Sequence, residues 1–292
     1  MLRLLKPLEY YEEKYGTHFF GVNRMYLMME KQRNRGQDGC GVANVKLDVS
    51  PGTKYMHCEK SIDKDPIKDV FERVQRMGAD KLQRAPAEAR LLTKDGSSAG
   101  RIDPGWIKEN VPFAGELFLA HVRYGTDSDN SIDRCHPVLR ESNWMTRSLL
   151  LAGNFNITNN EDLFASLVQI GQHPRELSDT VTLLEKVGHF VDKENNDLYV
   201  KYAATGQAPR TCFSHIAENI NVARILRRAS TDWDGGYCIA GVFGHGDSFV
   251  LRDPCGIRPA FYFANDEVIV VASEAPLIQT VFQAPTEEVH PL

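Results

Sequence analysis

The order of the secondary-structure signals is the feature that most constrains the fold of this chain. Short apolar segments bounded by turn residues are typical of strands, and they occur before and after a long stretch of helical patterns. Because strands and helices do not alternate one for one, a parallel sheet built from βαβ units is disfavoured. The order predicts an α+β fold, a layered sandwich of antiparallel sheets. The strand-like segments are 117–123, 148–152, 237–243, 248–251, 260–263 and 267–272.

The helical segments are indicated by apolar residues spaced i, i+3, i+4 and i+7. Val22, Met25 and Met29 belong to such a stripe in a helix expected over 22–32. Asp65 and Pro66 mark the start of a second helix, as N-cap and first helical residue. Further helices are expected over 161–170, after the cap Ser178, and over 215–228 with Ile216, Ile220 and Ala223 facing inward.

Two further segments complete the predicted layout. The region 78–112 is polar and weakly periodic, so we expect a surface insertion there. The four C-terminal strands are expected to form a β-meander, with hairpin turns at 245–247 and 265–266. The chain as a whole is therefore expected to end in consecutive antiparallel strands.

Composition narrows the classes of function. The chain has 292 residues, 42% hydrophobic and 25% charged, which is ordinary for a globular protein of one large or two small domains. A net charge of -5 without a basic stripe disfavours a nucleic-acid partner. No apolar run is long enough to span a membrane, and the N-terminal residues carry charge too early for a secretory signal.

The cysteines indicate the compartment and argue against a metal centre. Six cysteines are scattered without a CxxC pair, which fits a reduced, cytoplasmic setting. His57-Cys58 and Cys135-His136 are adjacent pairs, and neighbours on a strand point to opposite faces. We therefore expect neither a metal site nor a cofactor.

Several short motifs far apart in the chain carry the residues that bear chemistry. In order, they resemble the RGQDxxG, HVRYxT, RDPxGIRP and ASE motifs of the glutaminase domain of class II glutamine amidotransferases, the N-terminal-nucleophile group. Within that group the chain is most similar to the amidophosphoribosyltransferases of purine biosynthesis. The resemblance implies a four-layer αββα sandwich of two antiparallel sheets, of the N-terminal-nucleophile hydrolase type. The matching segments are Arg35–Gly41, His121–Thr126, Arg252–Pro259 and Ala272–Glu274.

The resemblance also implies how L-glutamine would be bound. Arg123 would take the α-carboxylate, because a planar guanidinium donates two parallel hydrogen bonds; the alternative is a surface arginine at a strand end. Asp179 would take the α-ammonium, whereas its alternative role is to favour the positive end of a helix dipole. Thr126, in the same motif as Arg123, is the third predicted substrate-binding residue.

The amide-cleaving half of such a site needs donors for an oxyanion. The family uses His-Asn-Gly-Asn, and the matching segment here is Gly153-Asn154-Phe155-Asn156. Asn154 would donate through its side chain and Phe155 through its backbone N–H, provided that the local φ does not require glycine. Arg35 would lie beside the nucleophile, with a turn-stabilising arginine as the alternative. In the segment 252–259, Arg258 is expected to brace a hairpin.

The family nucleophile is an N-terminal cysteine, whose α-amine, with a pKa of about 7.7–8.0, takes the proton. This chain opens Met1-Leu2-Arg3, and an internal cysteine has no free α-amine. We therefore expect residues 1–292 to be an N-terminally truncated glutaminase domain, inactive as written. A non-catalytic glutamine-binding module or regulatory subunit is the alternative, and a hydrolase of another amide is a third. No phosphoribosyltransferase signature follows Val271, so that domain would be a separate partner, and a homo-oligomer is possible.

Overall fold

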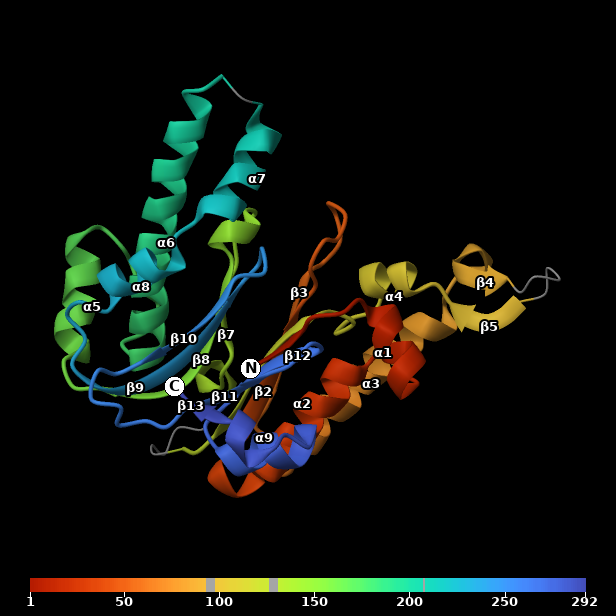
Figure 1. The fold of residues 1–292 in the computed structure, drawn as a ribbon. Coiled ribbons are helices and arrows are strands. Elements are labelled where there is room, and N and C mark those ends of the chain that lie inside the picture. Colours follow the sequence, from red (N-terminus) through yellow and green to blue (C-terminus); the bar gives the residue numbers. More distant parts are fainter. Residues whose placement is uncertain (93–97, 126–130, 207) are drawn as a thin grey trace. The chain divides into compact units, whose positions relative to one another are not determined.

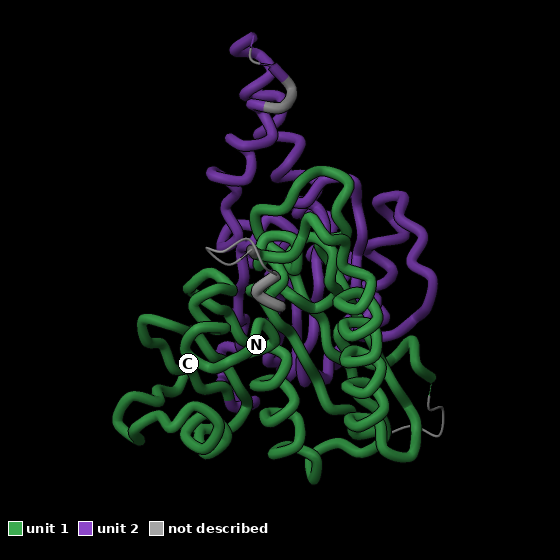
Figure 2. Tube along the Cα trace, turned by 90° about the vertical axis from the view of Figure 1, so that its right-hand side faces the viewer, with its two compact units in different colours: residues 1–137, 260–292 green, residues 138–259 purple. Residues whose placement is uncertain are grey.

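The computed structural model describes residues 1–92, 98–125, 131–206 and 208–292 (Figure 1). The chain divides into two compact units, coloured separately in Figure 2: unit 1 is Met1–Pro137 with Ala260–Leu292, and unit 2 is Val138–Pro259. Every strand pairing within the described ranges is antiparallel. Each unit is built around one principal sheet with helices packed on it.

Unit 1 contains a seven-stranded sheet in the order β13-β11-β12-β1-β6-β2-β3. β2 lies between β6 and β3, and all its residues are buried. Val42 and Phe118 of the sheet share one apolar core with Met25, Val70 and Ile278, which come from α2, α3 and α9. The strands are β1 (Leu2–Leu4), β2 (Gly39–Val45), β3 (Met56–Ser61), β6 (Leu117–Arg123), β11 (Phe261–Ala264), β12 (Val268–Ala272) and β13 (His290–Pro291).

The remaining elements of unit 1 are helices and a small sheet. A two-stranded sheet joins β4 (Arg90–Leu92) to β5 (Ser98–Ile102). The α-helices are α1 (Leu8–Tyr15), α2 (Phe20–Lys31), α3 (Pro66–Gln83), α4 (Pro104–Asn110) and α9 (Ala275–Phe282), and the 3-10 turns are η1 (Arg33–Arg35), η2 (Ala87–Ala89), η3 (Ile132–Arg134) and η5 (Thr286–Glu288).

Unit 2 contains a four-stranded sheet in the order β10-β9-β8-β7. Leu149 and Ile239 of this sheet share a second core with Leu183, Val187 and Ile225 from the helices. The strands are β7 (Val138–Arg140), β8 (Leu149–Ile157), β9 (Gly235–Phe243) and β10 (Ser248–Arg252); the helices are α5 (Asn160–Gln169), α6 (Asp179–Ala203), α7 (Pro209–Asn219) and α8 (Val222–Ala229), with a 3-10 turn η4 (Met145–Arg147).

Helix ends follow the sequence signals in most places. Ser178 accepts a hydrogen bond from the Val181 N–H at 3.3 Å and caps α6 as expected. Asp65 occupies the N-cap position of α3 but makes no side-chain cap; its carboxylate lies 3.2 Å from Arg33 instead. None of the helices within the described ranges is long and apolar enough to cross a membrane.

The single helix predicted over 215–228 is wrong, because this region belongs to two helices. The structure breaks it into α7 and α8, because Ile220 is extended and the side chain of Asn221 caps α8 by accepting the Arg224 N–H at 2.9 Å. Ile216 and Ile220 are buried as expected, whereas Ala223 is exposed. A residue that can cap a new helix competes with continuation of the old one.

The predicted C-terminal meander is also corrected. The hairpins β9–β10 and β11–β12 form with the expected turns, but they belong to different sheets. The expected surface insertion over 78–112 is wrong at both ends: α3 continues to Gln83 with Gly78 buried, and α4 buries Ile107. In each case the long-range packing partner, which local pattern does not encode, decides the outcome.

Candidate functional site

Two of the sequence motifs are joined in unit 1 by Asp38, to which the sequence assigned no role. The Asp38 N–H donates to the carbonyl of Arg123 at 3.1 Å. Its carboxylate Oδ2 accepts the N–H of Gly125 at 2.8 Å. One residue thus holds the main chain on both sides of Tyr124, immediately after the strand that ends at Arg123.

Gly36 allows the two motif turns to approach each other. An added Cβ at Gly36 would lie 2.7 Å from the carbonyl carbon and oxygen of Arg123. The backbone of Gly36 is extended, with φ of -168°, so space and not conformation demands glycine here. The glycine of the RGQD motif is therefore explained by backbone-to-backbone contact with the strand end that carries Arg123.

Replacing Gly36 by alanine is expected to destabilise the protein by about 1–3 kcal/mol, because rigid backbone must move to admit the methyl group. The urea midpoint of the far-UV circular dichroism transition measures this. Gly78→Ala is the matched control, since its Cβ would meet the Phe19 ring at an ordinary 3.4 Å in a helix. A Gly36→Ala variant as stable as the parent would contradict the close approach.

The ASE segment is attached to the same part of unit 1. Arg35 forms an ion pair with Glu274, and Gln32 Nε2 donates to Ser273 Oγ at 2.7 Å. Arg35 therefore bridges two motif segments that lie 239 positions apart in sequence. The contact is between exposed groups, so its contribution to the free energy of folding is small.

Arg123 is half-buried at the end of β6, directly opposite Gly39 in the ladder. Its Nη1 donates to the carbonyl of Ser131 at 3.3 Å. The guanidinium of the predicted carboxylate-binding residue is thus anchored to the segment that begins at Ser131. Thr126, the neighbouring predicted substrate-binding residue, lies outside the described residues.

In unit 2 the predicted oxyanion residues lie inside a strand that is longer than expected. The pattern predicted a strand over 148–152, but β8 continues to Ile157 and includes Asn154 and Phe155. Asn154 and Asn156 are exposed on one face, whereas Phe155 packs against the core of unit 2 on the other. Phe155 is not among the residues with positive φ, so its backbone does not require glycine.

Asp179 connects the start of α6 to the end of β8. Its Oδ2 accepts the N–H of Ile157 at 2.9 Å, three residues after Asn154. The half-buried carboxylate follows the N-cap Ser178, where a negative charge is also favoured by the helix dipole. Unit 2 therefore brings Asp179, Asn154 and Phe155 to one end of the strand.

The Arg252–Pro259 hairpin is held by Asp253 and Arg252. The buried Asp253 carboxylate accepts the N–H groups of Ile257 at 3.0 Å and Tyr237 at 3.3 Å. Arg252 donates to the carbonyls of Gly256 and Arg258, and Gly256 supplies a φ of +65°. The predicted brace was Arg258, but Arg258 takes part through its peptide groups, and the side chain that braces the hairpin is that of Arg252. Because Tyr237 lies opposite Phe155, the hairpin supports β8 from the next strand.

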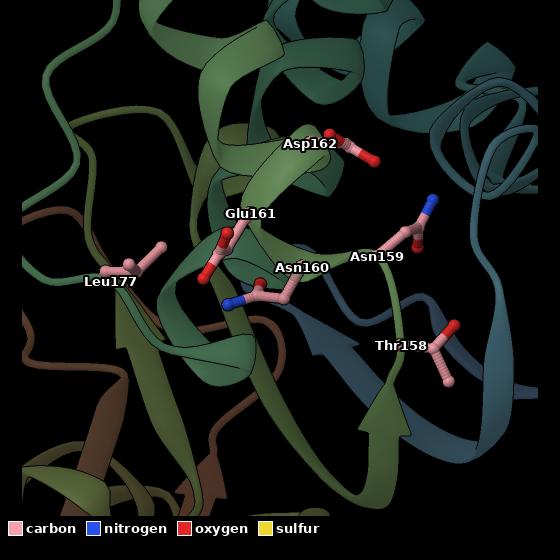
Figure 3. Close-up of a pocket in the computed structure, with 6 residues that line it drawn as sticks. All are labelled: Thr158, Asn159, Asn160, Glu161, Asp162 and Leu177. Carbon is pink, nitrogen blue, oxygen red and sulfur yellow. The ribbon is translucent and has the colours of Figure 1, made fainter.

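A polar cavity of about 450 Å³ lies at the start of α5 (Figure 3), and its lining residues are close in sequence to the Asp179–Ile157 contact. Thr158 directly follows Ile157, and Leu177 precedes Asp179 by two residues. Figure 3 shows Glu161 and Asp162 on the first turn of α5, where they give the wall a negative charge. Such a wall favours a cationic group such as an ammonium. The lining residues are Thr158, Asn159, Asn160, Glu161, Asp162 and Leu177.

Four of the six internal cysteines do not have the properties of activated nucleophiles. Burial raises the pKa of Cys40 to about 12 and that of Cys58 to about 11. Burial also raises the pKa of Cys238 and of Cys135. At Cys135 the nearby Arg123 guanidinium acts in the opposite direction, but burial has the larger effect on the pKa. A nucleophilic cysteine needs a lowered pKa. These four thiols are therefore protonated near neutral pH.

Comparison with known proteins shows which proteins this chain is similar to. No family model matches the chain. The amidophosphoribosyltransferase of Methanothermobacter thermautotrophicus is 23% identical over 177 residues, which are 61% of this chain and 31% of that protein. The chain is related to the glutamine amidotransferase domain of the amidophosphoribosyltransferases.

Solved structures show the same fold. The glutamine phosphoribosylpyrophosphate amidotransferase of B. subtilis, complexed with ADP and GMP, matches with a TM-score of 0.56 and 19% identity, over 92% of this chain and 42% of that one. A structure described as the allosteric regulatory enzyme of purine biosynthesis matches with a TM-score of 0.56, 18% identity and the same coverage. The structural likeness to these amidophosphoribosyltransferases confirms the predicted fold class, which is α+β with antiparallel sheets of the N-terminal-nucleophile hydrolase type. The chain spans less than half the length of these relatives.

Proposed function

We propose that this chain is a glutamine-binding domain of the amidotransferase type. Arg123 binds the α-carboxylate of L-glutamine through its guanidinium fork, and Asp179 binds the α-ammonium. The side chain of Asn154 and the backbone N–H of Phe155 face the oxygen of the side-chain amide. Thr126 and Arg35 complete the site, next to Arg123 in sequence and in the adjoining turn respectively.

The observation that carries this proposal is the pair of hydrogen bonds by which Asp38 fixes the main chain at Arg123 and Gly125. The RGQD and HVRY motifs were identified in the sequence, where Asp38 and Arg123 are 85 residues apart. In the structure they are joined by hydrogen bonds of 3.1 and 2.8 Å. A rigid turn behind an arginine lowers the entropy lost when its guanidinium binds a carboxylate. The acidic wall of the cavity at the start of α5 supports an amino acid as the ligand, because its ammonium group is attracted there.

The relatives suggest what the glutamine nitrogen is used for. They are called amidophosphoribosyltransferase and glutamine phosphoribosylpyrophosphate amidotransferase, and we extend the activity in these names to the present chain as ammonia supply for phosphoribosylamine synthesis. The partner is then a phosphoribosyltransferase domain or subunit. A cytoplasmic location fits the free state of all six cysteines.

A non-catalytic glutamine-binding module is the second candidate function. The raised pKa values of Cys40, Cys58, Cys135 and Cys238 favour it for the polypeptide 1–292, because none of these thiols is poised to attack an amide. The two candidates share the same binding residues and differ only in turnover.

Titration calorimetry with L-glutamine tests the proposal directly. We expect saturable binding of L-glutamine, with L-asparagine at least tenfold weaker because its shorter side chain cannot reach the amide donors while its α-groups are held. The proposal would be contradicted if glutamine did not bind at concentrations of several millimolar, or if asparagine bound with equal affinity. An ammonia assay on the same sample then separates the candidates: release supports the enzyme, and binding without release supports the module.

A further inference from the structure

The side chain of Arg123 is contacted by a short segment with no assigned role, Ser131–Cys135. Ser131 accepts from Arg123 Nη1 at 3.3 Å. Its own side chain caps the turn η3 by accepting the Asp133 N–H at 3.3 Å, and the Cys135 N–H closes that turn onto Ile132 at 3.1 Å. The two ends of the segment are thereby held in a fixed relation to each other.

The Cys135 thiol lies on the same face of the sheet as the Arg123 side chain. Gly39 pairs with Arg123 in the β2–β6 ladder, and residues directly opposite each other point to one face. A Cβ at Gly39 would lie 2.7 Å from Cys135 Sγ, so the sulfur occupies the place of a side chain next to Arg123. Gly39 has a φ of +154°, which also favours glycine. Cys135 is fully buried and therefore cannot touch a ligand in solution directly.

We propose that Cys135 is a positioning residue for Arg123, holding the guanidinium together with the Ser131 carbonyl in the direction needed for an amino-acid carboxylate. This inference rests on the proposed function of Arg123. A guanidinium has five N–H donors, so bonds to the segment Ser131–Cys135 are compatible with a bidentate carboxylate contact. The guanidinium also opposes the burial that raises the pKa of the Cys135 thiol, as expected for a contact between the two groups.

The role predicts which substitutions matter. Cys135→Val keeps an apolar side chain of similar size but removes the acceptor, and it is expected to weaken glutamine binding roughly three- to tenfold. Cys135→Ser restores an acceptor and is expected to bind within about twofold of the parent. Cys212→Ala, at another buried cysteine, is the control for a general loss of packing and is expected to bind as the parent does.

A double-mutant cycle measured by calorimetry on residues 1–292 tests the inference. In an Arg123→Ala background, Cys135→Val is expected to cause no further loss of glutamine affinity. Equal losses in both backgrounds, or parental affinity in a folded Cys135→Val protein, would overturn the positioning role. If Cys135→Val does not fold, Cys135→Ala is measured against Cys135→Ser in the same cycle with the same criteria. Failure of the proposed function shows up separately, as an Arg123→Ala protein that binds glutamine like the parent, and it removes this inference as well.

Discussion

Arg123→Ala is expected to lower the affinity for L-glutamine at least tenfold. The variant removes a charge-assisted contact with the α-carboxylate, and hydrogen bonds to charged groups contribute roughly 1.5–3 kcal/mol. That free energy corresponds to a factor of roughly ten to a hundred and fifty in the dissociation constant. Titration calorimetry at constant salt measures the change, and a thermal melt of the same sample checks that the protein remains folded.

Two variants sharpen the test of Arg123. Arg123→Lys keeps the charge but loses the planar fork, so an intermediate affinity is expected. Arg101→Ala is the matched control, because Arg101 is an exposed arginine of the same unit that pairs with Glu12. Equal affinities of the parent and Arg123→Ala would remove Arg123 from the binding site. A comparable loss in Arg101→Ala would point to general electrostatics instead of a specific carboxylate contact.

Asp253→Ala is expected to destabilise the protein by about 2–4 kcal/mol at pH 7. Asp253 is 4% exposed, and its carboxylate accepts backbone N–H groups of Tyr237 and Ile257, which would lose their acceptor. Asp253→Asn keeps the shape and one acceptor oxygen, so a smaller loss is expected. Urea unfolding followed by tryptophan fluorescence measures the free energy of unfolding.

The pH dependence of this effect has a definite sign. Burial raises the pKa of Asp253, but the backbone N–H donors of Ile257, Arg258 and Tyr237 outweigh it and bring the pKa below its usual value. The ionised group therefore stabilises the fold above the unfolded pKa of about 3.9, and this stabilisation is lost as pH falls through the lower folded pKa. The gap between parent and Asp253→Ala should shrink from pH 7 to pH 3.5.

Asp266→Ala is the control for Asp253, because Asp266 is an exposed aspartate in a hairpin turn. Its effect on the free energy of unfolding is expected to stay within about 0.5 kcal/mol. A loss of similar size in both variants, or a gap for Asp253→Ala that widens on acidification, would contradict the assigned role of the buried carboxylate.

The motif residues show how far sequence reasoning reaches. The RGQD and HVRY segments were predicted to carry function, and they do meet, but no sequence pattern indicated that Asp38 makes both hydrogen bonds. Gly36 is explained only by the carbonyl of Arg123, a residue 87 positions away. The role of Cys135 is of the same kind, since its place beside Gly39 follows from the fold. Contacts between distant segments leave no periodic signal in either segment.

The length of a strand and the choice of its partner also depend on contacts between distant segments. The predicted strand ended at residue 152, before Gly153, yet β8 continues to Ile157 because β9 supplies hydrogen-bonding partners throughout its length. An added Cβ at Gly153 would lie 2.5 Å from the Cys238 carbonyl oxygen, so close packing and not a turn accounts for this glycine. A glycine inside a strand has this second meaning as well as the first.

By itself, the amino-acid sequence determined the positions of α2 and α5, the starts of α3 and α6, the two hairpin turns and the α+β class, because capping, apolar spacing and turn chemistry act over a few neighbouring residues. The tertiary structure alone decided that the hairpins β9–β10 and β11–β12 join different sheets, and that Asp38 holds the strand end of Arg123. The physical reason is that a strand edge offers the same N–H and C=O groups to any partner, so burial of side chains far apart in sequence selects the pairing.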